Sequence, residues 1–564
     1  MAFQQKRRTQ TAEYWLDEFA VYKEDIEYLY EWLVEESEPR TVDELSLKTM
    51  ERRCHREEEA LSKRNDRGLI YQPQDKYEVG QQLVFPAFDY AAGQVLAVRV
   101  GNNPRYGSFR VIQVQLENEN VPREFATEFS LDHPLKRSVA LLEDSANLLS
   151  PKQLYERYGQ NVRERLQDAL LHSEDFVHFN GHWFLPGLMP EVTPFHLNIA
   201  EAMIDERGQS LATSQLLEEV QLPPGSKTSV RVYALDYALS RDPRFVRAGL
   251  PGKPTWYLDS LIPAGVRQKP TRLRPMYKAQ GDEWLNRELY DFVMELGDEA
   301  DELGRMPAAM PGSLDSVQIL LTYPHRREGT LPLTTRALSL LSGKLPERFM
   351  VTFLDRPNRE KITGWVMPTA GYAWGLDEWY HRHGVPIGGL VELHRGDALL
   401  TLCIDYDEGK RKAEWVKEAK VFNGRLTFSM QRKAYTGRYD RHLLIDEGRV
   451  DQLDGLWTNA GEETRSLFEY LTEIFPELAK LSGQGLVHAK ALYSAVNLTR
   501  RCGAVPIFAE LTRRACFDPV GDGNWVYDES LRNVTYNASE EMSRRPSSRR
   551  QDLIVDRVYQ YGRQ

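Results

Sequence analysis

Positively charged side chains cluster in one part of a chain that is acidic overall. The net charge of the 564 residues is −11, yet residues 221–280 carry eleven Lys and Arg against three acids, a net charge of +8. Residues 11–40 carry ten acids against two cations, and residues 281–304 carry nine against one, so each of these segments has a net charge of −8. A phosphate backbone responds to the local field rather than to the charge of the whole chain. These cations could therefore form ion pairs with a polyanion, and the alternative is a solvated face.

Twelve Lys and Arg residues are the candidate phosphate-binding groups. They fall in predicted third helices, in predicted hairpins and in a proline-containing basic linker. We expect them to contact phosphate mainly, so that binding would depend on salt and tolerate many base sequences. The candidates are Arg163, Arg165, Lys227, Arg231, Arg247, Lys253, Arg267, Lys269, Arg272, Arg274, Arg513 and Arg514.

Three similar segments indicate the elements that would position these cations. Phe176–Leu185, Phe245–Leu258 and Phe517–Asp528 each begin with an aromatic residue, contain glycine and reach a tryptophan followed by apolar residues. This pattern is typical of a β-hairpin. Apolar spacing predicts three helices between residues 194 and 240, ahead of the second hairpin. Three helices followed by a hairpin make a winged helix, in which the third helix can enter a major groove.

The rest of the chain follows the same plan. The sequence predicts an α+β multidomain protein with three to four winged-helix domains interspersed with small β-barrel domains. In the first of these helical segments, Thr41–Glu44 (TVDE) has the spacing of a capping box. The predicted domains are residues 10–78 (helical, with a winged helix as one interpretation), 79–134 (small SH3-like β-barrel), 135–190 (winged helix), 191–260 (winged helix), 261–280 (basic linker, extended rather than packed), 281–345 (acidic helix and connector), 346–435 (β-rich, barrel-like), 460–530 (winged helix) and 531–564 (mobile tail).

Residues 194–258 resemble the HARE-HTH domains, winged helices found in the delta subunit of bacterial RNA polymerase. The matching stretches are IAEAMIDERGQSL, RFVRAG and TWYL. The resemblance implies a role in transcription or another DNA transaction, and such domains also bind proteins. The remainder of the chain resembles long bacterial proteins without an assigned role, which adds nothing on mechanism.

Motifs for catalysis, cofactors or metals are not found in the sequence. It contains no P-loop, no G-x-S-x-G, no H-E-x-x-H and no dinucleotide fingerprint, so we expect no enzyme and no cofactor. His381 and His383 are two residues apart and would not share a helical face, so no metal site is expected. The four cysteines form no C-x-x-C pair, and no apolar run is long enough to cross a bilayer. A cytoplasmic location without membrane contact fits these features.

The sequence favours a DNA-binding, transcription-associated protein that uses tandem winged helices on duplex DNA with low sequence specificity. The alternative is a protein–protein scaffold, associated with RNA polymerase or with a defence or repair complex, whose winged helices bind protein. The acidic amphipathic helix at 281–304 is expected either to cover the basic surface or to dock on a basic partner.

Overall fold

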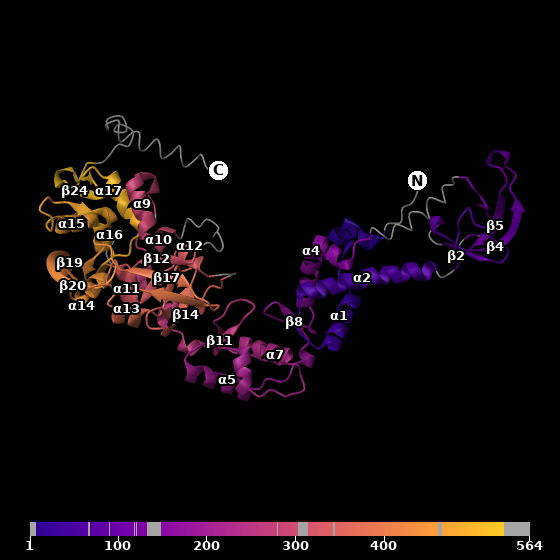
Figure 1. The fold of residues 1–564 in the computed structure, drawn as a ribbon, viewed down its shortest axis with the longest axis horizontal. Helices are drawn as coiled ribbons and strands as arrows, with labels where there is room; N and C mark the ends of the chain where they lie inside the picture. The colour runs from indigo at the N-terminus through magenta and orange to yellow at the C-terminus, as the bar shows by residue number, and fades with distance from the viewer. Residues whose placement is uncertain are drawn as a thin grey trace. The chain divides into compact units, whose positions relative to one another are not determined.

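The protein is a multidomain α+β protein, seen here in a computed structural model. The structure describes residues 7–534 apart from 66–67, 89–90, 118, 120, 132–147, 279, 303–313, 342–344 and 461–464. Most of the tail predicted at 531–564 therefore lies outside the described residues. The chain divides into two compact units, one of Met1–His196 with Val220–Ala238 and the other of Leu197–Glu219 with Leu239–Gln564. Figure 1 labels the elements of both units.

The first helical module is assembled from two segments that are distant in sequence. The strand β1 pairs antiparallel with β8, and Leu29, Leu45, Leu166 and Trp183 share one buried core. Residues 10–78 and 135–190, predicted as separate domains, thus contribute to one module. Its elements are α1 (Lys23–Glu36), β1 (Arg40–Thr41), α2 (Val42–Asn65), α4 (Pro151–Leu171), β7 (Val177–Phe179) and β8 (His182–Phe184).

A five-stranded sheet is inserted between α2 and α4. Its strands follow one another in the order β2-β3-β4-β5-β6. The loop after β2 reaches β6, because the backbone N–H of Phe129 donates to Pro73 O at 2.8 Å and that of Glu128 donates to Asp75 O at 3.1 Å. The sheet begins at Leu69, ten residues before the predicted boundary. The strands are β2 (Leu69–Ile70), β3 (Gln82–Phe85), β4 (Ala91–Val100), β5 (Arg110–Leu116) and β6 (Arg123–Thr127).

A second helical module has the same order of elements, and the boundary between the two units falls inside it. The part of α7 in the first unit carries Tyr233, whose hydroxyl donates to Val177 O at 2.9 Å and His182 O at 3.1 Å. In the second unit, the backbone N–H of Met350 donates to Ala248 O at 2.8 Å beside the β10–β11 hairpin. The elements are α5 (Pro194–Arg207), β9 (Leu211–Ala212), α6 (Thr213–Glu219), α7 (Thr228–Arg241), β10 (Phe245–Arg247) and β11 (Thr255–Leu258).

The centre of the second unit is a seven-stranded sheet that is nearly closed and barrel-like. Neighbouring strands are antiparallel except β14 and β18, which are parallel. The β-rich region predicted at 346–435 differs from this sheet, which takes in two earlier strands and excludes the two longest ones. In spatial order the strands are β12 (Ser316–Leu320), β17 (Leu390–Arg395), β18 (Thr401–Asp405), β14 (Phe349–Asp355), β15 (Lys361–Met367), β16 (Tyr372–Trp374) and β13 (Thr330–Pro332), and α11 (Tyr323–Glu328), α12 (Thr335–Leu338) and α13 (Asp377–His383) interrupt them along the chain.

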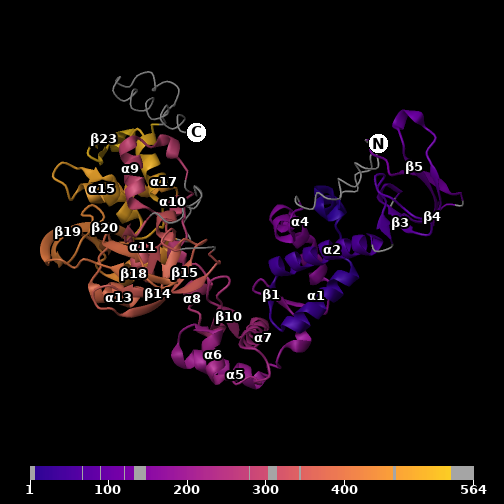
Figure 2. The ribbon, with the colours of Figure 1, turned by 45° about the vertical axis from the view of Figure 1, so that its right-hand side comes forward.

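The two longest strands, β19 (Lys412–Phe422) and β20 (Arg425–Tyr435), form a separate antiparallel ribbon. The turn residues Asn423 and Gly424 both have positive φ, as the tightest hairpin turns require. The short β21 (Ile445–Asp446) pairs with β19, and α14 (Val450–Ala460) follows. Figure 2 shows α15 (Leu467–Ala479) on the same side of the second unit as this ribbon.

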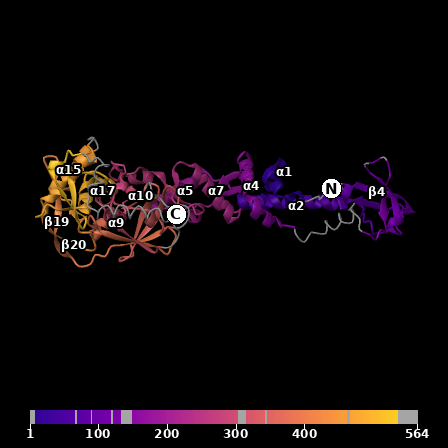
Figure 3. The same cartoon turned by 90° about the horizontal axis from the view of Figure 1, so that it is seen from above.

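The third helical module repeats the order of the first two. In each module the first strand pairs with the last, and the tryptophan of the hairpin lies opposite a residue of that first strand. The paired residues are Arg40 and Trp183, Leu211 and Trp256, and Val487 and Trp525. The three predicted hairpins are therefore confirmed as β7–β8, β10–β11 and β23–β24. The elements of the third module are α15, β22 (Val487–His488), α16 (Ala489–Val496), α17 (Ala504–Arg513), β23 (Phe517–Gly521) and β24 (Asn524–Tyr527), and Figure 3 shows α15 and α17 from above.

The basic linker and the acidic segment are both packed. Residues 261–280 include α8 (Ala264–Arg267) and bury Leu273, so the prediction of an extended linker is wrong. The helix α9 (Arg287–Leu296) buries its apolar face in the core of the second unit, and α10 (Glu299–Glu302) follows. The acidic segment is therefore part of the core and not a removable cover.

Candidate nucleic-acid interface

The candidate cations of the first helical module, and those at and just before the start of α7, are engaged by the chain itself. Arg163 pairs with Asp43 at 3.0 Å, and Arg165 donates to the backbone carbonyls of Leu16 and Phe19. Lys227 pairs with Glu38 at 3.1 Å. Arg231 donates to the Thr228 hydroxyl at 3.1 Å. Each contact competes with a phosphate for the same side chain.

The hairpin and linker candidates differ in their exposure and in their contacts. Arg247 and Lys253 are exposed on the β10–β11 hairpin, and Arg274, beyond the linker helix, is exposed and donates to Lys269 O at 3.0 Å. Arg267 pairs with Asp259 at 3.0 Å. Lys269 donates to Ala370 O at 2.9 Å, and burial lowers its pKa.

Arg272 and the two candidates at the end of α17 all pair with acids, and α17 itself is buried. Arg272 pairs with Glu328 at 3.0 Å and with Asp454 at 2.8 Å. All residues of α17 from Ala504 to Leu511 are buried, so the helix has no face that could enter a groove. Arg513 and Arg514, at its end, both pair with Glu510. These ion pairs could not be predicted from the sequence, because each acid partner either comes from a distant segment or is positioned by the packing of the helix.

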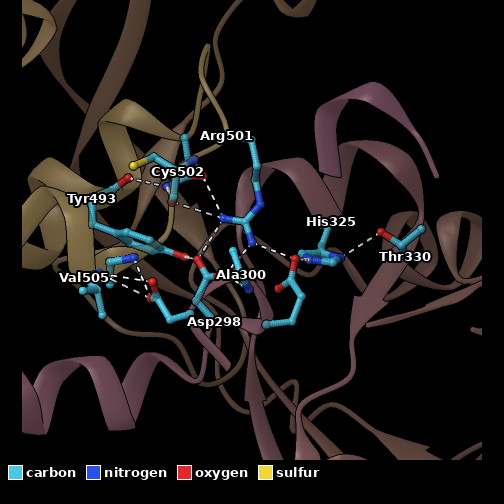
Figure 4. Close-up of polar contacts among 12 residues, drawn as sticks. Asp298, Ala300, His325, Thr330, Tyr493, Arg501, Cys502 and Val505 are labelled. Atoms are coloured by element: carbon cyan, nitrogen blue, oxygen red, sulfur yellow. Dashed lines mark hydrogen bonds and ion pairs between the residues drawn. The ribbon is translucent and has the colours of Figure 1, made fainter. Parts of the chain in front are cut away.

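A buried network of charged side chains holds the third module to the acidic segment (Figure 4). The guanidinium of Arg501 pairs with Asp298 at 2.5 Å and with Glu299 at 2.7 Å. His325 pairs with Glu299 at 3.1 Å, and the Tyr493 hydroxyl donates to Asp298. Burial alone would raise the pKa of Glu299. The charges of Arg501 and His325 have the opposite effect and hold this pKa well below its usual range. These side chains are all buried, so we interpret the network as structural.

A set of free cations lies on the β19–β20 ribbon and the two residues before it, where no candidate was predicted. Residues 410–441 carry ten Lys and Arg against three acids, a net charge of +7. Five of these cations pair with acids: Lys420 with Glu418, Arg425 with Glu473, Lys433 with Asp446, Arg438 with Glu392 and Arg441 with Glu414. The signal that could have revealed these cations is the net positive charge of residues 410–441.

Four cations at the open end of the ribbon are exposed and have no acid partner. Within the described residues, no hydrogen bond or ion pair engages the side chains of Lys410, Arg411, Lys412 and Arg432. Arg432 lies opposite Trp415 in the register of the ribbon, and the Trp415 side chain is exposed to 67% of its surface. An exposed aromatic ring among free cations is a combination that nucleic-acid-binding surfaces use.

A pocket of about 650 Å³ opens between the ribbon and the third module. Trp415, Lys417 and Met430 line it from the ribbon, and Leu478 and Leu481 line it from α15 and the residues after it. The Lys417 ammonium donates long hydrogen bonds to Arg441 O at 3.5 Å and His442 O at 3.4 Å. Burial lowers the pKa of Lys417 to about 8, against the opposing effect of Asp440.

Two stacked histidines form another wall of the pocket. The rings of His442 and His488 lie 3.6 Å apart between centroids. Burial, together with a smaller effect of His442, lowers the pKa of His488 to about 3. Burial also lowers the pKa of His442. Nδ1 of His488 accepts the backbone N–H of Lys490 at 3.1 Å, which leaves its proton on Nε2. Both rings are therefore uncharged hydrogen-bonding groups at neutral pH.

Among the described residues, no helix has the length and apolar character needed to cross a membrane, and no group of three or more His, Cys, Asp or Glu side chains could hold a metal ion. His383, one of the histidines considered above, instead contacts Glu408 and Asp355. Comparisons of the chain with protein-family models, with curated proteins and with solved structures find no match.

Proposed function

We propose that the protein binds DNA through the phosphate backbone, with the open end of the β19–β20 ribbon as the main contact. The observation that carries this proposal is the set of four exposed cations without acid partners, Lys410, Arg411, Lys412 and Arg432. Cations already paired within the fold must break that pair to reach a phosphate, whereas these four need not. Phosphate contacts of this kind are sequence-tolerant and weaken as salt rises.

The three helical modules support a DNA-related role without supplying the main contact. Each has the element order and strand pairing of a winged helix, with the first strand beside the last. This topology and the HARE-HTH resemblance of residues 194–258 favour a transcription-associated protein. We infer three winged helices in the described part of the chain, the first of them interrupted by the five-stranded sheet.

A protein scaffold is the second candidate, and the burial of α17 is the observation that favours it. When the third helix of a winged helix is buried, its surface contacts protein and is not available to DNA. In this chain the covering segments belong to the same molecule. The Tyr233 hydroxyl of α7 makes a similar contact with the β7–β8 hairpin. Retention on heparin at moderate salt separates the two candidates, because a scaffold without a free cationic surface flows through.

The salt dependence of DNA affinity tests the proposed function. The variant Lys410→Gln/Arg411→Gln/Lys412→Gln/Arg432→Gln is titrated with a duplex of random sequence at several salt concentrations. We expect the magnitude of the slope of log K against log salt to fall by about 3.6, because each of the four lost phosphate contacts removes about 0.9. The matched control is Arg163→Gln/Lys227→Gln/Arg513→Gln/Arg514→Gln, whose native cations are paired within the chain and whose slope should stay close to that of the native protein. Equal slopes for the native chain and the ribbon variant would exclude the ribbon as the contact.

A further inference from the structure

Trp415 lies on β19, between the free cations and the pocket. It is paired with Arg432 across the ribbon and lines the pocket. Lys417, two residues along the same strand, lines the same pocket. Because alternate residues of a strand point to the same face, the Trp415 and Lys417 side chains lie on one face of the ribbon.

The size and lining of the pocket suit one nucleotide unit. A volume of about 650 Å³ lies in the range that small-molecule sites occupy. Its walls combine apolar side chains, including Leu478, Leu481 and Met430, with the hydrogen-bonding groups of His442, His488 and Asn524. The Lys417 ammonium adds a positive charge, and its hydrogen bonds to Arg441 O and His442 O are long, at 3.5 and 3.4 Å. This lining offers stacking and hydrogen bonds to a base, and a cation to a phosphate.

We propose that the pocket receives one unstacked base of single-stranded DNA whose backbone follows the free cations of the ribbon. Trp415 stacks on the base at the entrance, and Lys417 neutralises the adjacent phosphate. The inference rests on the proposed function, because the ribbon must hold the strand for its base to reach the pocket. It goes further by assigning a preference for unpaired over duplex DNA.

Base pairing explains why the strand must be single. In a duplex each base is paired and stacked, and turning one out of the helix costs a few kcal/mol. An unpaired strand does not lose the base pair, so its base enters the pocket at lower cost. Stacking on an aromatic side chain contributes in a sequence-tolerant manner, since every base has a π face.

The test compares two aromatic residues of the same ribbon. Trp415→Ala and Phe422→Ala are each titrated with labelled oligo(dT) of about 20 nucleotides, a length that spans one or more typical single-strand sites, and with a duplex of equal length. Phe422 is the matched control because its side chain is 68% exposed and it lies outside the pocket lining. We expect Trp415→Ala to weaken oligo(dT) binding about ten-fold or more and to leave duplex binding unchanged, whereas Phe422→Ala changes neither.

Further variants and a competitor separate the possible outcomes. Trp415→Phe should restore most of the lost affinity, and Lys417→Met should weaken oligo(dT) binding while duplex binding stays unchanged. Thymidine monophosphate should fail to displace oligo(dT), because it cannot reach the ribbon cations. If micromolar thymidine monophosphate displaced oligo(dT), the pocket would instead bind a free nucleotide, and the inference would be overturned. If Trp415→Ala and Phe422→Ala lost equal oligo(dT) affinity, or if Trp415→Ala lost equal affinity for both DNAs, the role of the pocket would be overturned. If the native protein bound neither DNA, the proposed function itself would be refuted.

Discussion

The first and third helical modules share a topology but use their third helices in opposite ways. In α4 buried residues such as Leu154, Val162 and Leu166 alternate with exposed ones, so one face stays open to solvent. In α17 every residue from Ala504 to Leu511 is buried, because α9 and the short helix Asp282–Trp284 also pack against it. The difference teaches that the shared order of elements in these modules does not by itself assign a surface to DNA.

The ion pairs of the two modules provide the largest expected difference. Arg501→Met leaves Asp298 and Glu299 buried without their main partner, and we expect a loss of about 3–5 kcal/mol in stability. Arg163→Met breaks a pair whose side chains are 39% and 55% exposed, and it should cost about 0–1 kcal/mol. Hydrogen exchange reports the opening free energy of each module separately. Similar losses of stability for both variants would show that the Arg501 network does not stabilise the third module more than a surface ion pair stabilises the first.

A charge placed on each third helix sharpens the comparison. Ala509→Lys puts a long cationic side chain into a buried position of α17, and overpacking with desolvation should cost about 2–3 kcal/mol. Gln160→Lys changes an exposed position of α4 and should stay within about 0.5 kcal/mol. The shift of the urea midpoint for each variant, followed by hydrogen exchange in the affected helix, is the measurement. A neutral Ala509→Lys would mean that α17 can turn a face to solvent.

The smallest expected effect concerns a feature that the two modules have in common. Ser150 caps α4 with Gln153 in a capping box, and Ser466 caps α15 with Glu469 in the same way. Ser150→Ala and Ser466→Ala should therefore each lose about 1 kcal/mol, because each removes one local hydrogen bond to a backbone N–H. Hydrogen exchange in the first turn of each helix measures the loss. A difference well above this size between the variants would show that tertiary packing, and not the local cap, controls the helix start.

Local features of the chain were predictable from sequence. The three hairpins are formed, and turn glycines such as Gly181 and Gly523 adopt the positive φ that their position suggested. The capping box at Thr41 and Glu44 is present as well, with Glu44 accepting the Thr41 N–H at 2.8 Å. Each of these features depends on residues within a few positions of one another, so periodicity and turn chemistry are enough to reveal it.

The candidate site was only partly predictable. The strands of the ribbon were recognised as β, and its cations are visible in the charge of residues 410–441. Which cations are free was not visible, because Arg272 and Lys227 find acids that are 56 and 189 residues away along the chain. The pocket could not be predicted from the sequence either, because its walls come from segments that approach one another only in the folded state.

The sequence by itself determined the helices, the hairpins and the strong local charge of this protein, since each follows from neighbouring residues. Only the tertiary structure decided that residues on either side of an inserted sheet complete one module, that α17 is buried and that four ribbon cations remain free. The physical reason is that burial and ion pairing depend on contacts between distant segments, and those contacts form only when the chain folds.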